Sequence, residues 1–261
     1  MTKIDLHNHT HYCNHATGTM REYIEEAIQQ NVDFFGFSCH APMDYDEKYR
    51  MNFCEMEDYL HQIDILKQEY IGRCHILCGL EVDYLPQHMD NRVLNAQVDY
   101  LIGSVHFLGE WGFDNPQFIG EYQHKDMELC WKQYLKTLRE MANMKAFDIV
   151  GHCDLLKIFN HPLPHSLHGD LLRTLKAFKQ ADIVLEINTA GLRKPIAELY
   201  PSTHILKEAF ALHIPITFGS DAHSIDQVGF KRNEAYHLAL HIGYKEAASF
   251  QNRCIKMHSI C

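Results

Sequence analysis

The chain has 261 residues, of which 46% are hydrophobic, and its formal net charge is -10 at pH 7. This charge disfavours a bulk nucleic-acid binder or a membrane-surface protein, because both need an extended basic face. No basic segment followed by an apolar stretch opens the chain, and no apolar run approaches the roughly 20 residues that span a bilayer, so we expect a cytoplasmic protein without a membrane partner.

Seven short runs rich in β-branched and aromatic residues predict seven strands. In chain order they cover residues 4–7, 34–39, 76–82, 100–106, 148–152, 183–187 and 214–218. Amphipathic stretches between them predict helices. The clearest of these cover residues 20–30, 56–70, 127–144, 169–180 and 203–212.

This alternation of strands and helices predicts an α/β fold with parallel strands and helical crossovers. About seven such units in a chain of this length favour a closed or nearly closed barrel, and an open doubly wound sheet is the structural alternative. No long linker or internal repeat divides the sequence. We therefore expect residues 1–261 to form a single barrel domain.

Side chains that commonly bind metals follow the predicted strands, each at its carboxyl end. In a barrel these ends converge on one rim, where active sites of such folds are built. Packing would favour Val, Ile and Leu at such positions, so a structural role does not explain the whole set. The residues concerned are His7, His9, His40, Glu81, His106, His152, Asp221 and His223.

The first run, "DLHNH", alternates with period two, so Asp5, His7 and His9 point to the same face of an extended backbone. Two imidazoles on that face can share one ion. Asp5, deeper in the barrel, is expected to hydrogen-bond a ligating imidazole and set its tautomer. A single histidine at a strand end is more often structural, but the set of eight favours a metal site.

The segments "DLHNHTHYCNHATG", "SCHAP", "GLEVDY", "GSVHF", "VGHCD" and "TFGSDAH" resemble the ordered motifs of the polymerase and histidinol phosphatase (PHP) superfamily of phosphoesterases. The resemblance covers nearly the whole chain. It implies a distorted (β/α)7 TIM-like barrel with a cluster of three metal ions at its carboxyl-terminal rim.

The resemblance also implies how the ligands are shared among the ions. One ion would be held by His7, His9, Glu81 and Asp221, a second by His15, His40 and His223, and a third by Glu81, His106 and His152. Such imidazole and carboxylate donors suit Zn, Mn or Fe, and the residues alone do not choose among these metals. Neighbouring ions can activate water and neutralise the charge of a phosphate ester, so Glu81 and Asp221 count as catalytic candidates together with Asp5.

The segment "LEINTAGLRKPIAELYPS" resembles the part of histidinol-phosphatases in which an arginine contacts the substrate phosphate. Arg193 holds that position, and a guanidinium can clamp a phosphate with two parallel hydrogen bonds. The alternative is a solvated loop arginine. We expect Arg193, Lys194 and His223 to contact the substrate, whereas Lys157 is a weaker candidate.

Two other groups of residues have structural alternatives. Trp111 and Phe113 form either a wall or lid over an aromatic substrate, or simply pack the rim. Cys13, Cys39 and Cys153 lie beside ligands in the sequence but out of phase with them, so we interpret them as packing residues. The nine cysteines lack paired spacing, which disfavours a disulfide scaffold.

Together these features predict a metal-dependent phosphomonoesterase that resembles histidinol-phosphatases. It is expected to hydrolyse the small phosphate ester L-histidinol phosphate to L-histidinol and phosphate in histidine biosynthesis. The alternatives are a PHP phosphoesterase acting on another small ester or on a nucleic-acid end, or a non-catalytic metal-binding module. The acidic net charge disfavours the nucleic-acid substrate.

Overall fold

Seven short strands form the central sheet of the computed structural model, which describes residues 1–261. Each neighbouring pair of strands is parallel, in the order β1-β2-β3-β4-β7-β8-β9. Their bounds are Ile4–Asp5 (β1), Phe34–Phe37 (β2), His75–Asp83 (β3), Tyr100–Ser104 (β4), Ile149–Val150 (β7), Val184–Asn188 (β8) and Ile216–Gly219 (β9).

Backbone hydrogen bonds join the first strand region to the last and nearly close the sheet into a barrel. The Leu6 amide donates to the Phe218 carbonyl at 2.9 Å, and the Asp221 amide donates to the His7 carbonyl at 2.7 Å. Asn8 and Ala222 form a parallel bridge just beyond these bonds. The predicted seven-stranded barrel is therefore confirmed, and the open sheet is excluded.

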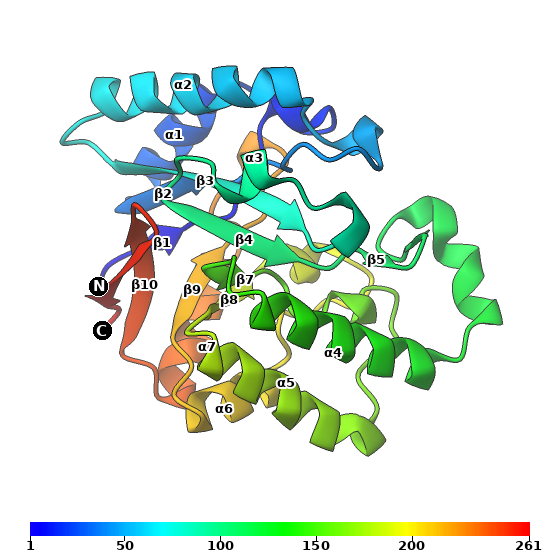
Figure 1. The fold of residues 1–261 in the computed structure, drawn as a ribbon. Helices are drawn as coiled ribbons and strands as arrows, with labels where there is room; N and C mark the ends of the chain where they lie inside the picture. The colour runs from blue at the N-terminus through cyan, green and yellow to red at the C-terminus, as the bar shows by residue number, and fades with distance from the viewer.

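Helices surround the barrel, with α1 and α2 along one side and α4 and α5 along another (Figure 1). α1 and α2 each begin with a capping box, in which two residues exchange hydrogen bonds between side chain and backbone amide. The pairs are Thr19 with Glu22 and Asn52 with Glu55. None of the helices combines the length and apolar character that crossing a bilayer requires. The main helices are Met20–Gln29 (α1), Phe53–Glu69 (α2), Met127–Asn143 (α4), His168–Gln180 (α5), Thr203–Ala211 (α6) and Arg232–Ile242 (α7).

The sequence patterns missed several elements. A hairpin of β10 (Glu246–Gln251) and β11 (Cys254–Ser259) packs at the start of the barrel strands, where the Phe250 ring lies 5.7 Å from that of Tyr100. It brings the chain ends together, since the Thr2 amide donates to the Ser259 carbonyl (Figure 1). A small hairpin, β5 (Phe107–Leu108) with β6 (Trp111–Gly112), and the short helix α3 (Asn91–Leu94) were also not predicted, nor was α7.

The first, second, fourth and fifth barrel strands end earlier than expected, with β2 ending at Phe37 instead of Cys39 and β4 at Ser104 instead of His106. β1 ends at Asp5 and β7 ends at Val150, whereas the patterns extended these strands to His7 and His152. The chain leaves the regular sheet there and turns, so both histidines stand on irregular backbone above the strand ends. This departure frees their side chains from the pleat and lets them face the barrel axis.

A single aromatic side chain fills the interior of the barrel between four strands. Tyr100 is fully buried, and its hydroxyl donates to the Leu6 carbonyl at 2.6 Å. β2 and β3 have a glycine where they contact this side chain. A Cβ on Gly79 would lie 2.4 Å from the Tyr100 ring, and a Cβ on Gly36 would lie 2.0 Å from the Tyr100 hydroxyl. The close approach of ring and backbone thus requires glycine at both positions.

We expect Gly79→Ala to destabilise the barrel by about 1–3 kcal/mol, because the added methyl group forces the Tyr100 ring out of its packed position. Gly120→Ala is the matched control, since a Cβ at Gly120 meets nothing within 4 Å. The control should change the free energy of unfolding by less than about 0.5 kcal/mol. Urea denaturation at one fixed metal concentration measures both variants, and equal stabilities would contradict this account of the barrel interior.

Candidate active site

Nine side chains from separate parts of the chain meet at the carboxyl-terminal end of the barrel. Their imidazole rings lie close together: the ring centroids of His9 and His223 are 3.9 Å apart, those of His9 and His40 are 4.4 Å apart, and those of His106 and His152 are 4.9 Å apart. The structure therefore places every proposed metal ligand in one cluster. The members are His7, His9, His15, His40, Glu81, His106, His152, Asp221 and His223.

Glu81 lies at the centre of this cluster, on β3, with a side chain that is only 1% exposed. Its Oε2 atom lies 3.1 Å from His40 Nδ1 and 3.3 Å from His7 Nε2. Its Oε1 atom accepts a hydrogen bond from the Ser104 hydroxyl and lies 2.9 Å from His152 Nε2. The two carboxylate oxygens thus face two different groups of imidazoles.

Asp221 provides a second carboxylate on the opposite side of the rings. Its Oδ1 atom lies 3.2 Å from His9 Nε2 and 3.9 Å from His7 Nε2. The backbone of Asp221 has a φ of 52°, and that of His152 has a φ of 21°. Such backbone conformations are unfavourable for residues other than glycine by about 1–3 kcal/mol and are typical of functional sites.

The cluster has the donors and the spacing that metal ions need. Several imidazole nitrogens are buried without any hydrogen-bond partner, among them His7 Nε2, His40 Nδ1 and both nitrogens of His9. Tetrahedral donors at zinc–nitrogen distances of about 2.0–2.1 Å lie about 3.3–3.4 Å apart, which matches the separations around Glu81 and Asp221. Among the donor sets that approach one another are His7–His9–Asp221, His9–His40–His223 and His7–Glu81–His152, and Cys13 joins two further sets, with His9 and Cys39 and with His15 and His223.

Two buried carboxylates that sequence reasoning missed orient the imidazole rings. Glu186 Oε1 lies 2.7 Å from His7 Nδ1, and Asp83 Oδ1 lies 2.5 Å from His106 Nδ1. Each contact directs the opposite nitrogen of the ring toward Glu81, which is the usual role of such partners around metal ligands. The signal in the sequence was a charged residue within an otherwise apolar strand, in "VLEIN" and in "GLEVD".

The expected hydrogen bond between Asp5 and a ligating imidazole is wrong. Asp5 Oδ1 accepts from the Ser220 amide and the Asn8 side chain, and Oδ2 accepts from the Ser220 hydroxyl and the Gly229 amide. These four donors satisfy the carboxylate on the barrel side of the loop that follows β9. Asp5 therefore holds the segment that carries Asp221, and the orienting role belongs to Glu186.

Burial and charge act against each other throughout the cluster. Burial raises the pKa of Glu81, but the imidazoles around it, led by His7, hold that pKa well below its usual value. Burial lowers the pKa of His106, but the charge of Asp83 outweighs this effect and raises the pKa to about 10. For His223, burial prevails and lowers the pKa to about 3. Because metal ligation requires neutral imidazoles, protons compete with metal ions for this cluster.

Arg193 reaches the cluster from the turn that follows β8. Its Nη2 atom donates to the carbonyls of Ser220 and Asp221 at 3.0 and 2.9 Å, while its Nη1 atom is buried without a partner. Arg193 and Lys194 both line the cavity above the metal-binding residues. Lys157 does not line it, because this side chain is paired with carboxylates elsewhere. Arg193 Nη1 therefore keeps an unused hydrogen-bonding capacity beside the cavity that this residue lines.

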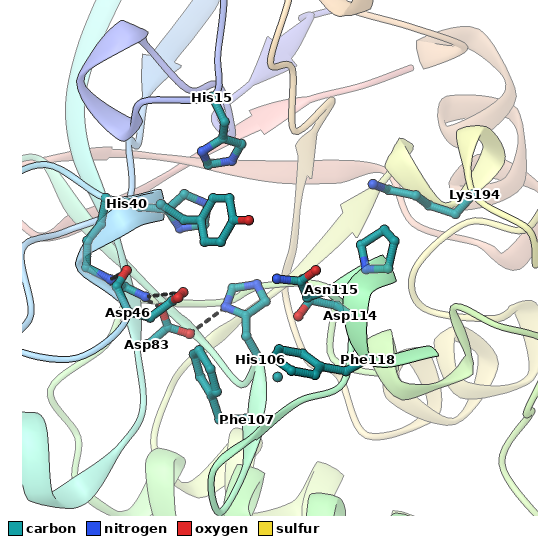
Figure 2. Close-up of a pocket in the computed structure, with 14 residues that line it drawn as sticks. His15, His40, Asp46, Asp83, His106, Phe107, Asp114, Asn115, Phe118 and Lys194 are labelled. Carbon is teal, nitrogen blue, oxygen red and sulfur yellow. Dashed lines mark hydrogen bonds and ion pairs between the residues drawn. The ribbon is translucent and has the colours of Figure 1, made fainter. Parts of the chain in front are cut away.

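Two cavities of about 400 Å³ and 250 Å³ share the residues His15, His40, His106, Asp114 and Lys194 and so form one cleft (Figure 2). Neither Trp111 nor Phe113 lines it. Both are buried, and the Phe113 ring packs against Tyr134. These two aromatic residues pack the rim, whereas the residues that follow them reach the cleft.

The three cysteines beside the ligands are buried, which agrees with their interpretation as packing residues. Cys13 donates through its thiol to the Thr10 carbonyl at 3.1 Å. Cys13 and Cys39 also lie close to His9, nearer to the cluster than their phase in the sequence indicated. All nine cysteines of the chain are free, so the structure contains no disulfide.

Comparison with known proteins relates this site to one family. The family model described as "PHP domain" matches residues 5–190. A probable histidinol-phosphatase of Deinococcus radiodurans is 37% identical over 254 residues, which cover 95% of this chain and 96% of the relative. The histidinol-phosphatase of Bacillus subtilis is 31% identical over 259 residues, covering 88% of this chain and 97% of the relative.

A solved structure has the same fold. Histidinol phosphate phosphatase from Lactococcus lactis, in complex with Zn, L-histidinol and phosphate, superposes with a TM-score of 0.80 at 24% identity, covering 98% of this chain and 99% of that chain. With the barrel, the cluster and these relatives established, the chain belongs to the PHP domain family and is a homologue of its histidinol-phosphatases.

Proposed function

We propose that this protein is a metal-dependent phosphomonoesterase that hydrolyses L-histidinol phosphate to L-histidinol and phosphate, as a step of histidine biosynthesis in the cytoplasm. The observation that carries the proposal is the cleft itself, which seven of the nine proposed metal ligands line together with Arg193, whose Nη1 atom has no partner. A metal cluster next to a fixed cation suits a phosphate dianion. Relatives of similar length that carry the name histidinol-phosphatase support the choice of substrate.

We propose that the cluster holds three ions, with Glu81 shared between two of them, although the side chains that approach one another most closely in the structure group His9, rather than His15, with His40 and His223. One ion would be held by His7, His9, Glu81 and Asp221. The second would be held by His15, His40 and His223, and the third by Glu81, His106 and His152. The central position of Glu81, with one oxygen toward each group of rings, supports its bridging role. Imidazole and carboxylate donors suit Zn, Mn or Fe.

Bound metal ions would supply Lewis acidity and lower the pKa of a coordinated water. The residues of the chain do the remaining work. Arg193 binds the phosphate through Nη1, because its Nη2 is already fixed by two carbonyls of the loop that carries Asp221. Glu186 and Asp83 hold the imidazoles in their binding orientation. Lys194 and His223 line the same cavity and contact the substrate from its other sides.

Metal content gives one test. Protein purified without chelator should approach three ions per chain by elemental analysis, and Glu81→Ala should lose more metal than His15→Ala, because Glu81 faces two groups of ligands and His15 only one. Circular dichroism of both variants controls for unfolding. A wild-type content near one ion, or equal metal loss in the two variants, would contradict the shared cluster.

Arg193 gives a second test. Arg193→Ala should keep its metal but lose about 2 to 4 kcal/mol of transition-state stabilisation, measured as kcat/KM on L-histidinol phosphate. Arg193→Lys should recover only part of this loss, since an ammonium group keeps the charge but lacks the planar fork that bonds the two loop carbonyls through one nitrogen and the phosphate through the other. Arg173→Ala, which removes an exposed guanidinium on α5, is the control and should leave the kinetics unchanged. Unchanged kinetics in Arg193→Ala would remove the phosphate clamp from the mechanism.

A further inference from the structure

The smaller part of the cleft has a different character from the part beside Arg193. Its cavity of about 250 Å³ continues from the metal-binding residues toward the segment after β6. Its lining contains the carboxylates Asp46, Asp83 and Asp114, the aromatic rings Tyr49, Phe107 and Phe118, and also Arg50, Lys194 and three histidines (Figure 2). Because Arg50 is already paired with Asp83 and Asp46, the aromatic rings and the remaining carboxylate suit a cationic organic group.

Among the carboxylates that line the cleft, only Asp114 has no cationic partner. Asp83 pairs with Arg50 at 3.0 Å, and Asp46 lies 3.6 Å from the same guanidinium. Glu81 and Asp221 are each surrounded by imidazoles. No lysine, arginine or histidine nitrogen lies within 4.0 Å of the Asp114 carboxylate. Asp114 therefore has no direct ion-pair partner in the cleft, although the charges of His106 and His152 act on it from a greater distance.

The backbone holds Asp114 firmly at the wall of the cavity. The preceding residue, Phe113, is fully buried, and its amide donates to the carbonyl of His106 at 3.2 Å. The following residue, Asn115, donates its amide to the Gly112 carbonyl and accepts a hydrogen bond from the Gln117 amide. Burial raises the pKa of Asp114 more than the charge of His106 lowers it, so a cation bound beside it would favour the ionised carboxylate.

We propose that Asp114 binds the ammonium group of an aminoalkyl phosphate ester and makes the enzyme selective for this class of substrate. The inference rests on the proposed function, because L-histidinol phosphate carries its ammonium group one carbon away from the phosphate-bearing carbon. The phosphate then lies at Arg193 and the metal-binding residues, and the organic part extends into the smaller cavity. Phe107 and Phe118 supply an apolar wall for the heterocycle.

This arrangement explains selectivity by a simple physical rule. A site that contains a buried charge for a substrate group rejects analogues without that group, because the charge is then left unpaired and dehydrated. Arg193 does not discriminate in this way, since every phosphate ester offers the same anion. Asp114 is thus the residue that distinguishes aminoalkyl esters from other phosphate esters.

The test compares Asp114→Asn with wild type on three phosphate esters. These are L-histidinol phosphate, its deamino analogue 3-(imidazol-4-yl)propyl phosphate, and p-nitrophenyl phosphate. The ratio of kcat/KM for the first ester to kcat/KM for the second should fall by about 30-fold or more in the variant, because only the first ester carries the ammonium group. Asp46→Asn removes a charge from the same cavity, but that charge is paired with Arg50, so the ratio should change by less than about threefold.

Each other outcome overturns the proposal in a recognisable way. An equal loss on both alkyl esters with p-nitrophenyl phosphate spared would make Asp114 a proton donor to the leaving group. Loss of metal from Asp114→Asn by elemental analysis would make it a ligand, and an unchanged ratio in a folded variant would leave it without a role in selectivity. If wild type itself hydrolyses p-nitrophenyl phosphate but does not prefer L-histidinol phosphate, the proposed function fails as well.

Discussion

The buried carboxylate of Glu81 among imidazoles is the interaction on which the rest of the site depends. A charge that is 1% exposed is very unfavourable unless positive charge surrounds it, and no lysine or arginine is near enough to provide it. Protonated histidines or metal ions must therefore compensate Glu81. Because several of the facing nitrogens have no hydrogen-bond partner, metal ions complete this arrangement better than protons do.

The barrel makes such a cluster possible because it brings residues that are distant in the sequence together and restricts their backbone positions. Parallel strands end at one rim, so His7 and Asp221 become neighbours although more than 200 residues separate them in the chain. Buried carboxylates behind the rings, Glu186 and Asp83, then fix the imidazole orientations. The same rim carries Arg193 on one loop and Asp114 on another, so a guanidinium and a carboxylate both line the cleft.

The barrel and the meeting of the strand-end side chains could be predicted from the sequence. The position of each strand and the alternation of its side chains are local patterns, and a parallel barrel brings the carboxyl ends of all its strands to one rim. The barrel and the proximity of the strand-end histidines and carboxylates were predicted for this reason, and their assignment as metal ligands stays a prediction. The carboxylates behind these histidines were not predicted, since Glu186 contacts His7 across 179 residues, and a charged residue within an apolar strand does not by itself indicate which side chain it contacts. Asp5 was assigned to an imidazole by phase alone, but backbone turns after β9 present closer donors.

Loop geometry explains the remaining differences. β10 and β11 lie outside the barrel and have mixed polarity, so their pattern carried no clear strand signal. The proposed role of Asp114 depends on the lack of an ion-pair partner for its carboxylate. A sequence motif does not show which side chains lack such partners. Trp111 and Phe113 drew attention because aromatic residues stand out in a glycine-rich segment, yet the aspartate beside them is the residue that enters the cleft.

The most direct test of the account measures kcat/KM on L-histidinol phosphate, p-nitrophenyl phosphate and a nucleoside monophosphate, before metal removal, after it, and after metal is restored. The account predicts a preference for L-histidinol phosphate of orders of magnitude, loss of all turnover with chelation, and recovery with Zn, Mn or Fe. Comparable kcat/KM values for the three esters, or undiminished turnover by protein shown to contain no metal, would contradict it.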